Sequence, residues 1–453
     1  MRGRATDGPN RNLQVTRGFY GTVSCRMRVD RGIRGRWALE FGRFPKQGLT
    51  FALVLAMALS IASPASAGSG GASSSPTSSG RTAPKGDPFA TRGMWIWELA
   101  HSDGGNLSSL IADARRYGIN TLFIKSGDGT SIWSQFNASL VSTLRAHGLR
   151  VCAWQYAYGN HPITEAYVGA TAVKDGANCL VIDAESEYEG KYVSAQAYMT
   201  RLRKLIGANY PVSLAGFPYV DFHPGFPYSV FLGPGGAQYN TPQMYWADIG
   251  TTVDAVYSHT YEFNRIYERE IDPLGQTFNR PRLGQIKRFR QMSRSYGAGG
   301  VSWWNWQSST TGTWQALSQS VGPLTGVIAD TSLAPIGLHA AGDVVVWAQE
   351  HLVTAGEPIT IDGGFGPQTL AAVENFQSAH GLPVDGVIGT LTWQALLRYA
   401  PASVKWVHRG KRIVATPASA RRAGIVEPVP KSASLRAKRD EIAGAGGAGR
   451  PDH

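Results

Sequence analysis

Eight short apolar segments alternate with mostly amphipathic segments between residues 92 and 320 of this chain. The series begins with GMWIWEL and NLSSLIADARRYG and ends with GVSWWNWQSS and GTWQALSQ; after the fifth apolar segment, VSLAGFPYV, a loop replaces the amphipathic segment. Strands that alternate with helices predict a parallel sheet, because each helix carries the chain back to the edge where the next strand begins. Eight such units favour a closed (β/α)8 barrel over an open sheet. We therefore predict an α/β fold, a TIM barrel, over residues 92–320.

The segments that flank this central part differ from it in composition. Residues 1–67 end in LTFALVLAMALSIASPASA, an apolar run with an Ala-x-Ala end, which predicts a leader with a secretory signal peptide. Residues 68–91 are rich in Gly, Ser and Pro, which predicts a linker. Residues 401–453 contain few large apolar residues, which predicts a disordered basic tail. The mature chain is therefore expected to be secreted or held at the cell wall.

The basic charge of the chain lies at its ends. The formal net charge is +12, but residues 1–67 hold +8, residues 401–453 hold +7, and residues 92–400 hold −4. A nucleic-acid-binding surface in the folded part is therefore not expected. The tail could contact anionic wall polymers or could simply be solvated. No segment of the mature chain is long and apolar enough to cross a bilayer, so we expect no membrane partner after signal cleavage, and a monomer.

Three cysteines are present, with Cys25 in the leader and Cys152 and Cys179 inside apolar runs. The favoured interpretation is that Cys152 and Cys179 are separate buried thiols, and a bridge between neighbouring strands is the alternative. No Cys or His spacing is typical of a zinc site, so we expect no metal and no cofactor.

Two acids end the fourth apolar segment, in the sequence ANCLVIDAESEYEG. Residues two apart on a strand project from the same face, so Asp183 and Glu185 should project together at the end of the barrel where such folds place their chemistry. Two close carboxylates cannot both ionise easily, and glycosidic cleavage needs one acid that keeps its proton. We predict Glu185 as the general acid and Asp183 as the group that orients it and stabilises positive charge at the sugar or an intermediate. An exposed acidic loop, a loop cap or a pair with Lys125 is the alternative.

Polar and aromatic side chains gather at the other strand ends. Flat rings offer apolar faces to sugar C–H groups, although some must fill the barrel core because alternate positions face inward and outward. Gln243 and Tyr245 share a face of the sixth strand and could hydrogen-bond a substrate N-acetyl group or position a reaction intermediate; core or ring-orienting roles are equally open. The predicted substrate-binding residues are Glu98, Lys125, Gln155, Tyr156, Gln243, Tyr245, Trp304 and Trp306.

Three motifs resemble a known family. DAE on the fourth strand, PQMYW on the sixth and WWNW on the eighth are similar to motifs of the Chalaropsis-type lysozymes (glycoside hydrolase family 25) and of related glycoside-hydrolase-like barrels from actinobacterial exported proteins. In those lysozymes an Asp-x-Glu at the end of strand four carries the acid, which corresponds here to Asp183 and Glu185. They also place an Asp in a first strand beginning GIDVS, where this chain has GMWIWEL and offers Glu98.

A second pattern fills residues 333–400, after a linker at 321–332. GDVVVWAQEHL and IDGGFGPQTLAAVENFQSAHGLPVDGVIGTLTWQAL place apolar residues at helical spacing, with two Asp–Gly turns before helices that start at Thr369 and Thr390. The unit resembles the all-α, three-helix peptidoglycan-binding domain. The resemblance implies that wall glycan or peptide binds near these turns, where the candidates are Asp362, Phe365, Asp385 and Trp393. Core positions for Phe365 and Trp393 are the alternative.

Together these features predict a secreted glycoside hydrolase that cleaves β-1,4 glycosidic bonds of peptidoglycan or another cell-wall polysaccharide by acid-assisted hydrolysis. The C-terminal unit would tether the enzyme to the wall and so raise the effective substrate concentration. The alternative is a non-catalytic peptidoglycan- or glycan-binding protein with a degenerate barrel. A barrel that acts on some other polysaccharide is a third interpretation. Amidase or peptidase activity is disfavoured, because neither zinc-ligand spacing nor a Cys–His constellation occurs.

Overall fold

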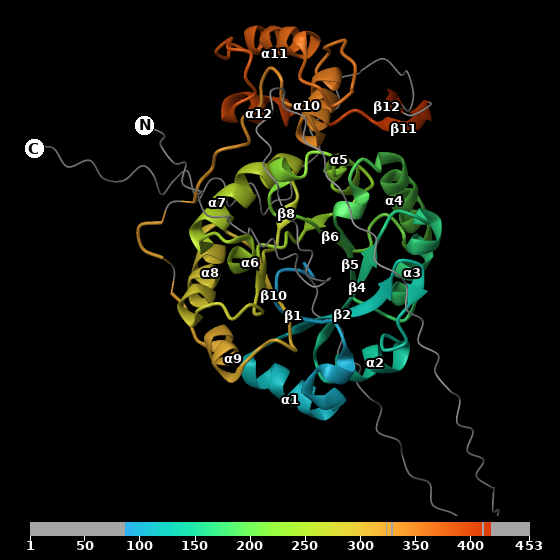
Figure 1. The fold of residues 1–453 in the computed structure, drawn as a ribbon, viewed down its shortest axis with the longest axis vertical. Coiled ribbons are helices and arrows are strands. Elements are labelled where there is room, and N and C mark those ends of the chain that lie inside the picture. The colour runs from blue at the N-terminus through green and yellow to red at the C-terminus, as the bar shows by residue number, and fades with distance from the viewer. Residues whose placement is uncertain (1–86, 323, 328, 410–411, 418–453) are drawn as a thin grey trace, which may run out of the picture. The chain divides into compact units, whose positions relative to one another are not determined.

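The computed structural model of the chain describes residues 87–322, 324–327, 329–409 and 412–417. The predicted leader, its signal peptide and all but the last residues of the first linker lie outside these ranges. Within them, a ring of parallel strands is surrounded by helices (Figure 1). The TIM barrel predicted from the repeated strand and helix segments is therefore confirmed.

Neighbouring strands of the barrel pair in the order β8, β7, β6, β5, β4, β2, β1, β10, β9. The seventh unit contributes two short strands, β8 and β9, and a parallel bridge between Gln243 and Leu274 joins the sixth unit to β9. A further short strand, β3, pairs antiparallel with the end of β2. The strands are β1 (Arg92–Ile96), β2 (Thr121–Asp128), β3 (Ser131–Ile132), β4 (Arg150–Ala157), β5 (Cys179–Ala184), β6 (Val212–Ala215), β7 (Tyr239–Asn240), β8 (Glu270–Ile271), β9 (Leu274–Gln276) and β10 (Val301–Trp304).

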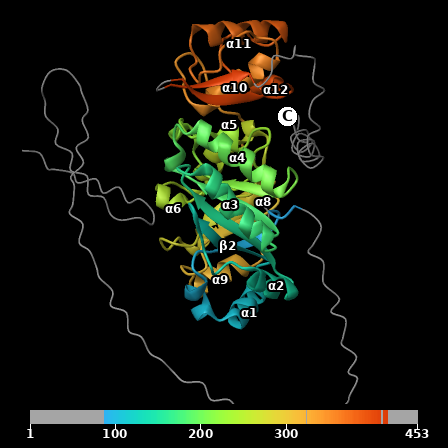
Figure 2. The same ribbon diagram turned by 90° about the vertical axis from the view of Figure 1, so that its right-hand side faces the viewer.

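Helices cover the outside of the ring, as the side view in Figure 2 also shows. They are α1 (Leu107–Tyr117), α2 (Ala138–Ala146), α3 (Pro162–Lys174), α4 (Tyr192–Ile206), α5 (Tyr228–Phe231), α6 (Trp246–Ile249), α7 (Val253–Asn264), α8 (Leu283–Ser295) and α9 (Thr311–Ser318). Short 3-10 turns are η1 (Leu99–His101), η2 (Asp103–Gly105), η3 (Ser186–Tyr188), η4 (Val220–Phe222) and η5 (Arg265–Tyr267). Local sequence sets several helix ends: the Asn106 side chain accepts the Ser109 N–H at the start of α1, which ends at Gly118 with a φ of 69°.

Side chains of the barrel strands separate into two groups by alternation. One group fills the barrel interior and includes Trp95, Phe123, Trp154 and Val181. The other group, which includes Leu122, Ile124, Leu180 and Ile182, joins the core between the sheet and the helices. The interior is thus a packed aromatic core, and the chemistry has to lie at its ends.

A disulfide joins Cys152 and Cys179 inside the barrel. These residues are register partners on the adjacent parallel strands β4 and β5, which brings their Cα atoms to 4.6 Å. The favoured prediction of two separate thiols was wrong, and the alternative of a bridge between neighbouring strands is correct. Sequence spacing could not decide this point, because it depends on the register of the two strands.

Three helices follow the barrel: α10 (Asp343–Thr354), α11 (Pro367–Ala379) and α12 (Thr390–Leu396). Their facing sides bury Val345, Leu352, Val373, Phe376 and Trp393, all of which are at most 1% exposed. The all-α unit predicted after the barrel is therefore confirmed.

An antiparallel hairpin follows these helices, made of β11 (Val404–Arg409) and β12 (Arg412–Pro417). The predicted disorder of residues 401–453 is therefore wrong for this segment, while residues 418–453 lie outside the described part. VKWVHR and RIVATP carry β-branched and aromatic residues suited to a strand, which the basic composition of the whole segment concealed. Among the described residues, no helix is long and apolar enough to span a membrane.

Candidate active site

The two acids predicted from the sequence lie together at the carboxyl end of β5. Asp183 is 7% exposed, and Glu185, just beyond the strand, is half-buried. One amide contacts both side chains, because Nε2 of Gln243 donates to Oδ1 of Asp183 (3.1 Å) and to Oε1 of Glu185 (3.0 Å). A single side chain from the sixth unit therefore holds the two carboxyl groups in one constellation.

The surroundings of Asp183 favour its protonated form. Burial raises the pKa of Asp183 well above its ordinary value, and the carboxylate of Glu185 raises it further, while the ammonium of Lys125 acts in the opposite direction. Because the charge of one acid disfavours ionisation of the other, the pair retains a proton above the pH at which an isolated carboxyl group would lose it. An acid–base reaction can use such a proton.

Two tyrosines flank the acid pair. Tyr156 on β4 is the register partner of Asp183, and its hydroxyl donates to Oε2 of Glu187 at 2.8 Å. Burial and the charges of Glu185 and Asp183 raise the pKa of Tyr156, and burial and the charges of the same two acids raise the pKa of Tyr245. Both phenols therefore stay neutral and keep their O–H groups as hydrogen-bond donors, that of Tyr156 being directed to Glu187.

Lys125 projects from β2 close to the same acids. It is 2% exposed, and its Nζ forms an ion pair with Oδ2 of Asp128 at 2.6 Å. The ammonium also faces two indole rings, with 4.3 Å to the centroid of Trp133 and 4.9 Å to that of Trp154. The aromatic contacts and the carboxylate compensate for its burial, so a charged Lys125 can lie near Asp183.

Trp304 supplies an aromatic face from β10. Its ring packs edge-on against Trp154 at a centroid distance of 5.2 Å and against Trp95 at 5.9 Å. Because Trp304 is only half-buried, part of its surface is accessible. It therefore stays a candidate for contact with a ligand, as do Lys125, Tyr156, Gln243 and Tyr245.

The prediction of a substrate-binding role was wrong for two residues, Gln155 and Trp306. Gln155 is completely buried on the outer face of β4, where its Nε2 donates to the backbone oxygens of Gly129 (3.2 Å) and Glu165 (2.8 Å). Trp306 is 3% exposed and packs edge-on against Trp314 outside the barrel interior. Both side chains stabilise the structure.

Glu98 follows β1 and pairs with His101 at the surface. Within the described part of the chain, no recorded contact joins Glu98 to the acid pair, so its predicted role stays a prediction.

Two acids of the constellation were not predicted. Glu187 accepts the hydroxyl of Tyr156, and Asp128 accepts both Lys125 and the hydroxyl of Tyr158. The sequence carried a signal for each: Glu187 continues the alternation of Asp183 and Glu185, and Asp128 ends β2. In the part of the chain that the structure describes, no group of three or more His, Cys, Asp or Glu side chains is arranged to hold a metal ion.

In the helical unit, two buried glutamines organise the two Asp–Gly turns in the same way. Gln349 on α10 is completely buried, and Gln377 on α11 is 1% exposed. Nε2 of each glutamine has three acceptor oxygens within hydrogen-bond distance of its two N–H groups, and Oε1 accepts two backbone N–H groups. For Gln349 the partners are Asp362 Oδ1, Gly364 O, Thr369 Oγ1, Asp362 N and Gly363 N; for Gln377 they are Asp385 Oδ1, Val387 O, Thr392 Oγ1, Asp385 N and Gly386 N.

The four candidates near these turns have different positions. Phe365 is 2% exposed and Trp393 is completely buried, so their prediction as binding residues was wrong and the core alternative is correct. Asp362 and Asp385 are exposed residues, but one carboxylate oxygen of each holds its own turn. The Val387 N–H and the Gln377 amide lower the pKa of Asp385. Wall contact by Asp362 or Asp385 stays a prediction.

Residues 341–396 match the peptidoglycan binding domain family. A zinc D-Ala-D-Ala carboxypeptidase of Streptomyces albus G is 51% identical over 41 residues, which are 9% of this chain and 16% of that protein. An uncharacterized protein in the bpoA1 3′ region of Kitasatospora aureofaciens is 58% identical over 36 residues, which are 8% of this chain and 30% of that protein. The chain thus spans less than a third of the length of either relative.

Solved structures similar to the chain fall into two groups. A peptidoglycan-binding protein from Clostridioides difficile is 40% identical, with a TM-score of 0.14, over 14% of this chain and 41% of that chain. A class V chitinase from Nicotiana tobaccum is 10% identical, with a TM-score of 0.38, over 51% of this chain and 99% of that chain.

The peptidoglycan-binding domain exposes apolar side chains around its second turn. Val384 is 58% exposed, Val387 is 40% exposed, and Leu391, in the first turn of α12, is 59% exposed. Leu338, at 43%, lies two residues beyond Ile336, which forms a bridge with Ile388. The sequence LPVDGVIGTL contains Val384, Val387 and Leu391, but their exposure could not be predicted from the sequence.

Proposed function

We propose that the chain is an exported glycoside hydrolase that cleaves β-1,4 bonds of peptidoglycan, with its C-terminal domain as a wall anchor. The observation that carries the proposal is the contact of one amide, from Gln243, with both Asp183 and Glu185 at the carboxyl ends of the barrel strands. The raised pKa of Asp183 supports it, because the acid pair then keeps a proton that a glycosidic oxygen needs.

In the proposed reaction Glu185 is the proton donor, because it is the more accessible of the two acids. Its proton passes to the glycosidic oxygen as the bond to the anomeric carbon breaks, so the leaving sugar departs as an alcohol. In this step the one proton of the pair lies on Glu185, so Asp183 is ionised; it orients Glu185 and stabilises the positive charge that develops on the remaining sugar. Water then adds to the anomeric carbon and returns a proton to Glu185, which restores the acid pair.

The neutral donors around the acids would recognise the substrate. Gln243 and Tyr245 lie beside the pair and are suited to an N-acetyl group or to a charged intermediate. Trp304 offers a partly accessible ring to a sugar face. The family motifs around Asp183 and Glu185 support the same substrate class, although the role of Glu98 in place of the first-strand Asp of the lysozymes is open to test.

The proposed anchor is the peptidoglycan-binding domain. Because Phe365 and Trp393 are buried, we propose the exposed surface formed by Leu338, Val384, Val387 and Leu391, together with the free side of Asp385, as its contact with the wall. Apolar side chains beside a carboxylate suit a polymer with both sugar and peptide groups.

The test of catalysis is release of reducing ends from purified bacterial walls by the wild type and by Glu185→Gln. Asp254→Asn is the matched control, because it makes the same change of carboxyl to amide in an exposed acid that pairs with Arg288 at the surface, away from the acid pair. We expect release by the wild type and the control, and a loss of at least about 100-fold in Glu185→Gln. Equal release by wild type and Glu185→Gln would exclude Glu185 as the proton donor.

A second candidate is a wall-binding protein without hydrolytic activity, which the family match of residues 341–396 supports by itself. This candidate predicts that the wild type and the barrel variants all pellet with walls. It also predicts that none of these proteins releases reducing ends. Val387→Asp and Leu391→Asp test the anchor in either case. They should reduce pelleting without changing release from soluble wall fragments.

A further inference from the structure

A hollow of about 250 Å³ lies at the amino-terminal end of the barrel. Its walls include Arg92 and Val301, the first residues of β1 and β10, and Asn120, which precedes β2. In a barrel of parallel strands this is the end opposite the acid pair, which follows the carboxyl end of β5. The hollow is therefore separate from the proposed active site.

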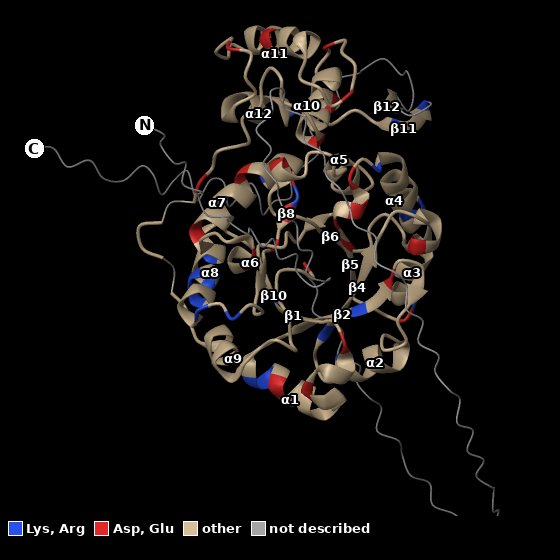
Figure 3. Cartoon of the chain, in the orientation of Figure 1, with Lys and Arg blue, Asp and Glu red and all other residues tan. Residues whose placement is uncertain are grey.

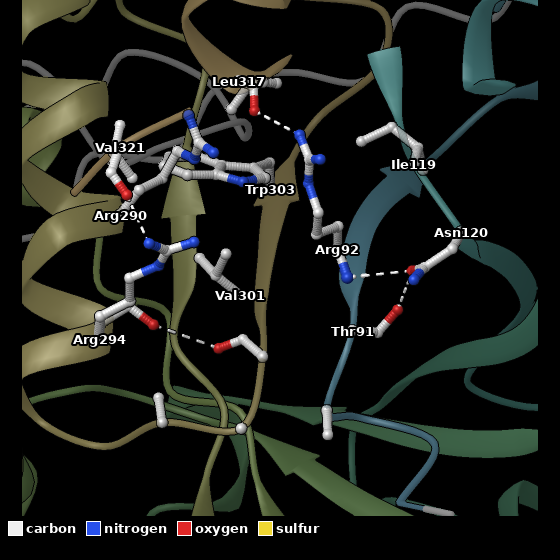
Figure 4. A pocket seen from close by; sticks show the side chains of 15 residues that line it. Thr91, Arg92, Ile119, Asn120, Arg290, Arg294, Val301, Trp303, Leu317 and Val321 are labelled. Atoms are coloured by element: carbon white, nitrogen blue, oxygen red, sulfur yellow. Dashed lines mark hydrogen bonds between the residues drawn. The ribbon is translucent and has the colours of Figure 1, made fainter. Parts of the chain in front are cut away.

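Three arginines converge on this hollow from two elements (Figure 4). Arg92 comes from β1, and Arg290 and Arg294 come from successive turns of α8. Figure 3 shows α8 as a helix rich in basic residues. None of the 15 residues that line this described hollow is acidic. Three positively charged side chains therefore line the hollow, and no Asp or Glu side chain among its lining residues neutralises them.

The arginines affect one another electrostatically. Burial lowers the pKa of Arg290 to about 10, and the charges of Arg92 and Arg294 contribute to this change. The pKa of Arg92 is also lowered, by burial and then by the charge of Arg294. Arg92 and Arg290 stay protonated at neutral pH despite these lowered pKa values, so the repulsion remains, and a bound anion would relieve it.

The arginines also have a structural role. Their side chains donate to backbone carbonyl groups in and just beyond the last turn of α9 and at the end of α1. The bonds run from Arg92 Nη2 to Tyr117 (3.2 Å) and Leu317 (2.6 Å), from Arg290 Nη1 to Ala316 (2.8 Å) and Gln319 (2.6 Å), and from Arg294 Nη1 to Val321. These bonds fix the position of each guanidinium through one terminal nitrogen. The carbonyl groups at these helix ends carry only partial negative charge, so they offset the three positive charges around the hollow in part.

We infer that the hollow binds a phosphate group, either as the free ion or as the end group of a small phosphate monoester. Planar guanidinium forks match the oxygens of a tetrahedral oxyanion, and three of them suit a dianion better than a singly charged carboxylate. The backbone closes one side, since a Cβ on Gly300 would lie 2.2 Å from the Thr91 nitrogen. The volume accommodates the phosphate and a short substituent.

The test is calorimetric titration of the full chain with inorganic phosphate, glycerol 3-phosphate and acetate in a phosphate-free buffer. We expect one saturable site with a Kd of about 1 mM or lower for phosphate. Arg294→Gln should weaken binding about tenfold, the loss expected for one charge-assisted hydrogen bond. Lys287→Gln removes one charge from the same helix outside the lining of the hollow, and should leave the affinity unchanged.

Absence of saturable phosphate binding by the wild type would overturn the inference. So would equal weakening by Arg294→Gln and Lys287→Gln, because the effect would then reflect overall charge. Acetate that binds as tightly as phosphate would refute the preference for a dianion. Binding of glycerol 3-phosphate as tight as that of phosphate supports an esterified ligand, and weaker binding supports the free ion. Thermal unfolding of both variants verifies that the fold is intact; Lys287→Gln should match the wild type, and Arg294→Gln should be slightly less stable because it loses its hydrogen bond to the Val321 carbonyl.

Discussion

Replacement of Gln349 by leucine should unfold most of the peptidoglycan-binding domain. The leucine keeps a similar volume, but the buried amide loses its contacts with five polar atoms, at distances between 2.8 and 3.1 Å. Its two N–H donors and the two N–H groups it accepts make about four hydrogen bonds. At about 1 kcal/mol per bond the cost is about 4 kcal/mol, and the partners left buried without a hydrogen bond add to it. A domain of this size has about 0.05–0.15 kcal/mol of stability per residue, so the loss is comparable to its whole stability.

Hydrogen–deuterium exchange of the full chain measures this effect, with peptides from residues 341–396 compared with peptides from the barrel. In Gln349→Leu the domain peptides should exchange rapidly while the barrel peptides stay protected, and wall pelleting should be lost. Gln368→Leu is the matched control, because that side chain is exposed and makes a single bond of 3.4 Å to Pro358. Its stability should change by less than about 0.5 kcal/mol.

A cost below about 2 kcal/mol for Gln349→Leu would refute the assignment of this glutamine as the central support of its turn. Gln349→Glu adds an independent test. The carboxylate would replace the donating Nε2 and face the oxygens of Asp362 and Gly364, so it should destabilise the domain at least as much as leucine. A tolerated glutamate at neutral pH would show that the bond directions are wrong.

Three further predictions concern other parts of the molecule. Cys152→Ala with Cys179→Ala should lower the free energy of unfolding by about 3.5 kcal/mol, and reductant should affect only the wild type in urea titrations. Burial lowers the pKa of His351 to about 4, so the stability due to its neutral form is present above about pH 6.5 and falls by about 3 kcal/mol as the pH drops through 4. His351→Asn should remove that part of the pH dependence of urea unfolding. Gln243→Leu removes a donor from both acids, which raises the pKa of Asp183 further and should shift the pH profile of wall hydrolysis upward; an unshifted profile would exclude Gln243 from the acid pair.

Sequence periodicity was sufficient to predict the barrel and the acid pair. The alternation of strand and helix segments fixed the fold class, and spacing by two placed Asp183 and Glu185 on one face. The same rule could have excluded Gln155: with Trp154 and Tyr156 assigned to the interior, the residue between them has to face the helices. The prediction placed Gln155 on the face of the strand that points into the barrel. The sequence of one strand does not show which of its two faces points inward.

Other features depended on contacts between distant segments. The pairing of Cys152 with Cys179 required the register of β4 and β5. The role of Gln243 required its side chain to reach the acids at the end of β5, although the fifth unit, with β6, lies between the two. Gln349 and Gln377 are polar residues on otherwise apolar helix faces, a signal that something polar has to meet them in the core. The sequence did not specify that the partner was the backbone of a turn.

The disulfide between Cys152 and Cys179 makes the rigidity of the barrel depend on the redox environment. The two cysteines are four residues before Tyr156 and Asp183 on the same pair of strands, in the same register. Sulfur atoms in a reducing cytoplasm stay unlinked, so a newly made chain would hold these strands by hydrogen bonds and packing alone. If the chain is exported as proposed, oxidation would follow export and covalently join the two strands, so that the end of the barrel that holds Asp183 would become rigid outside the cell.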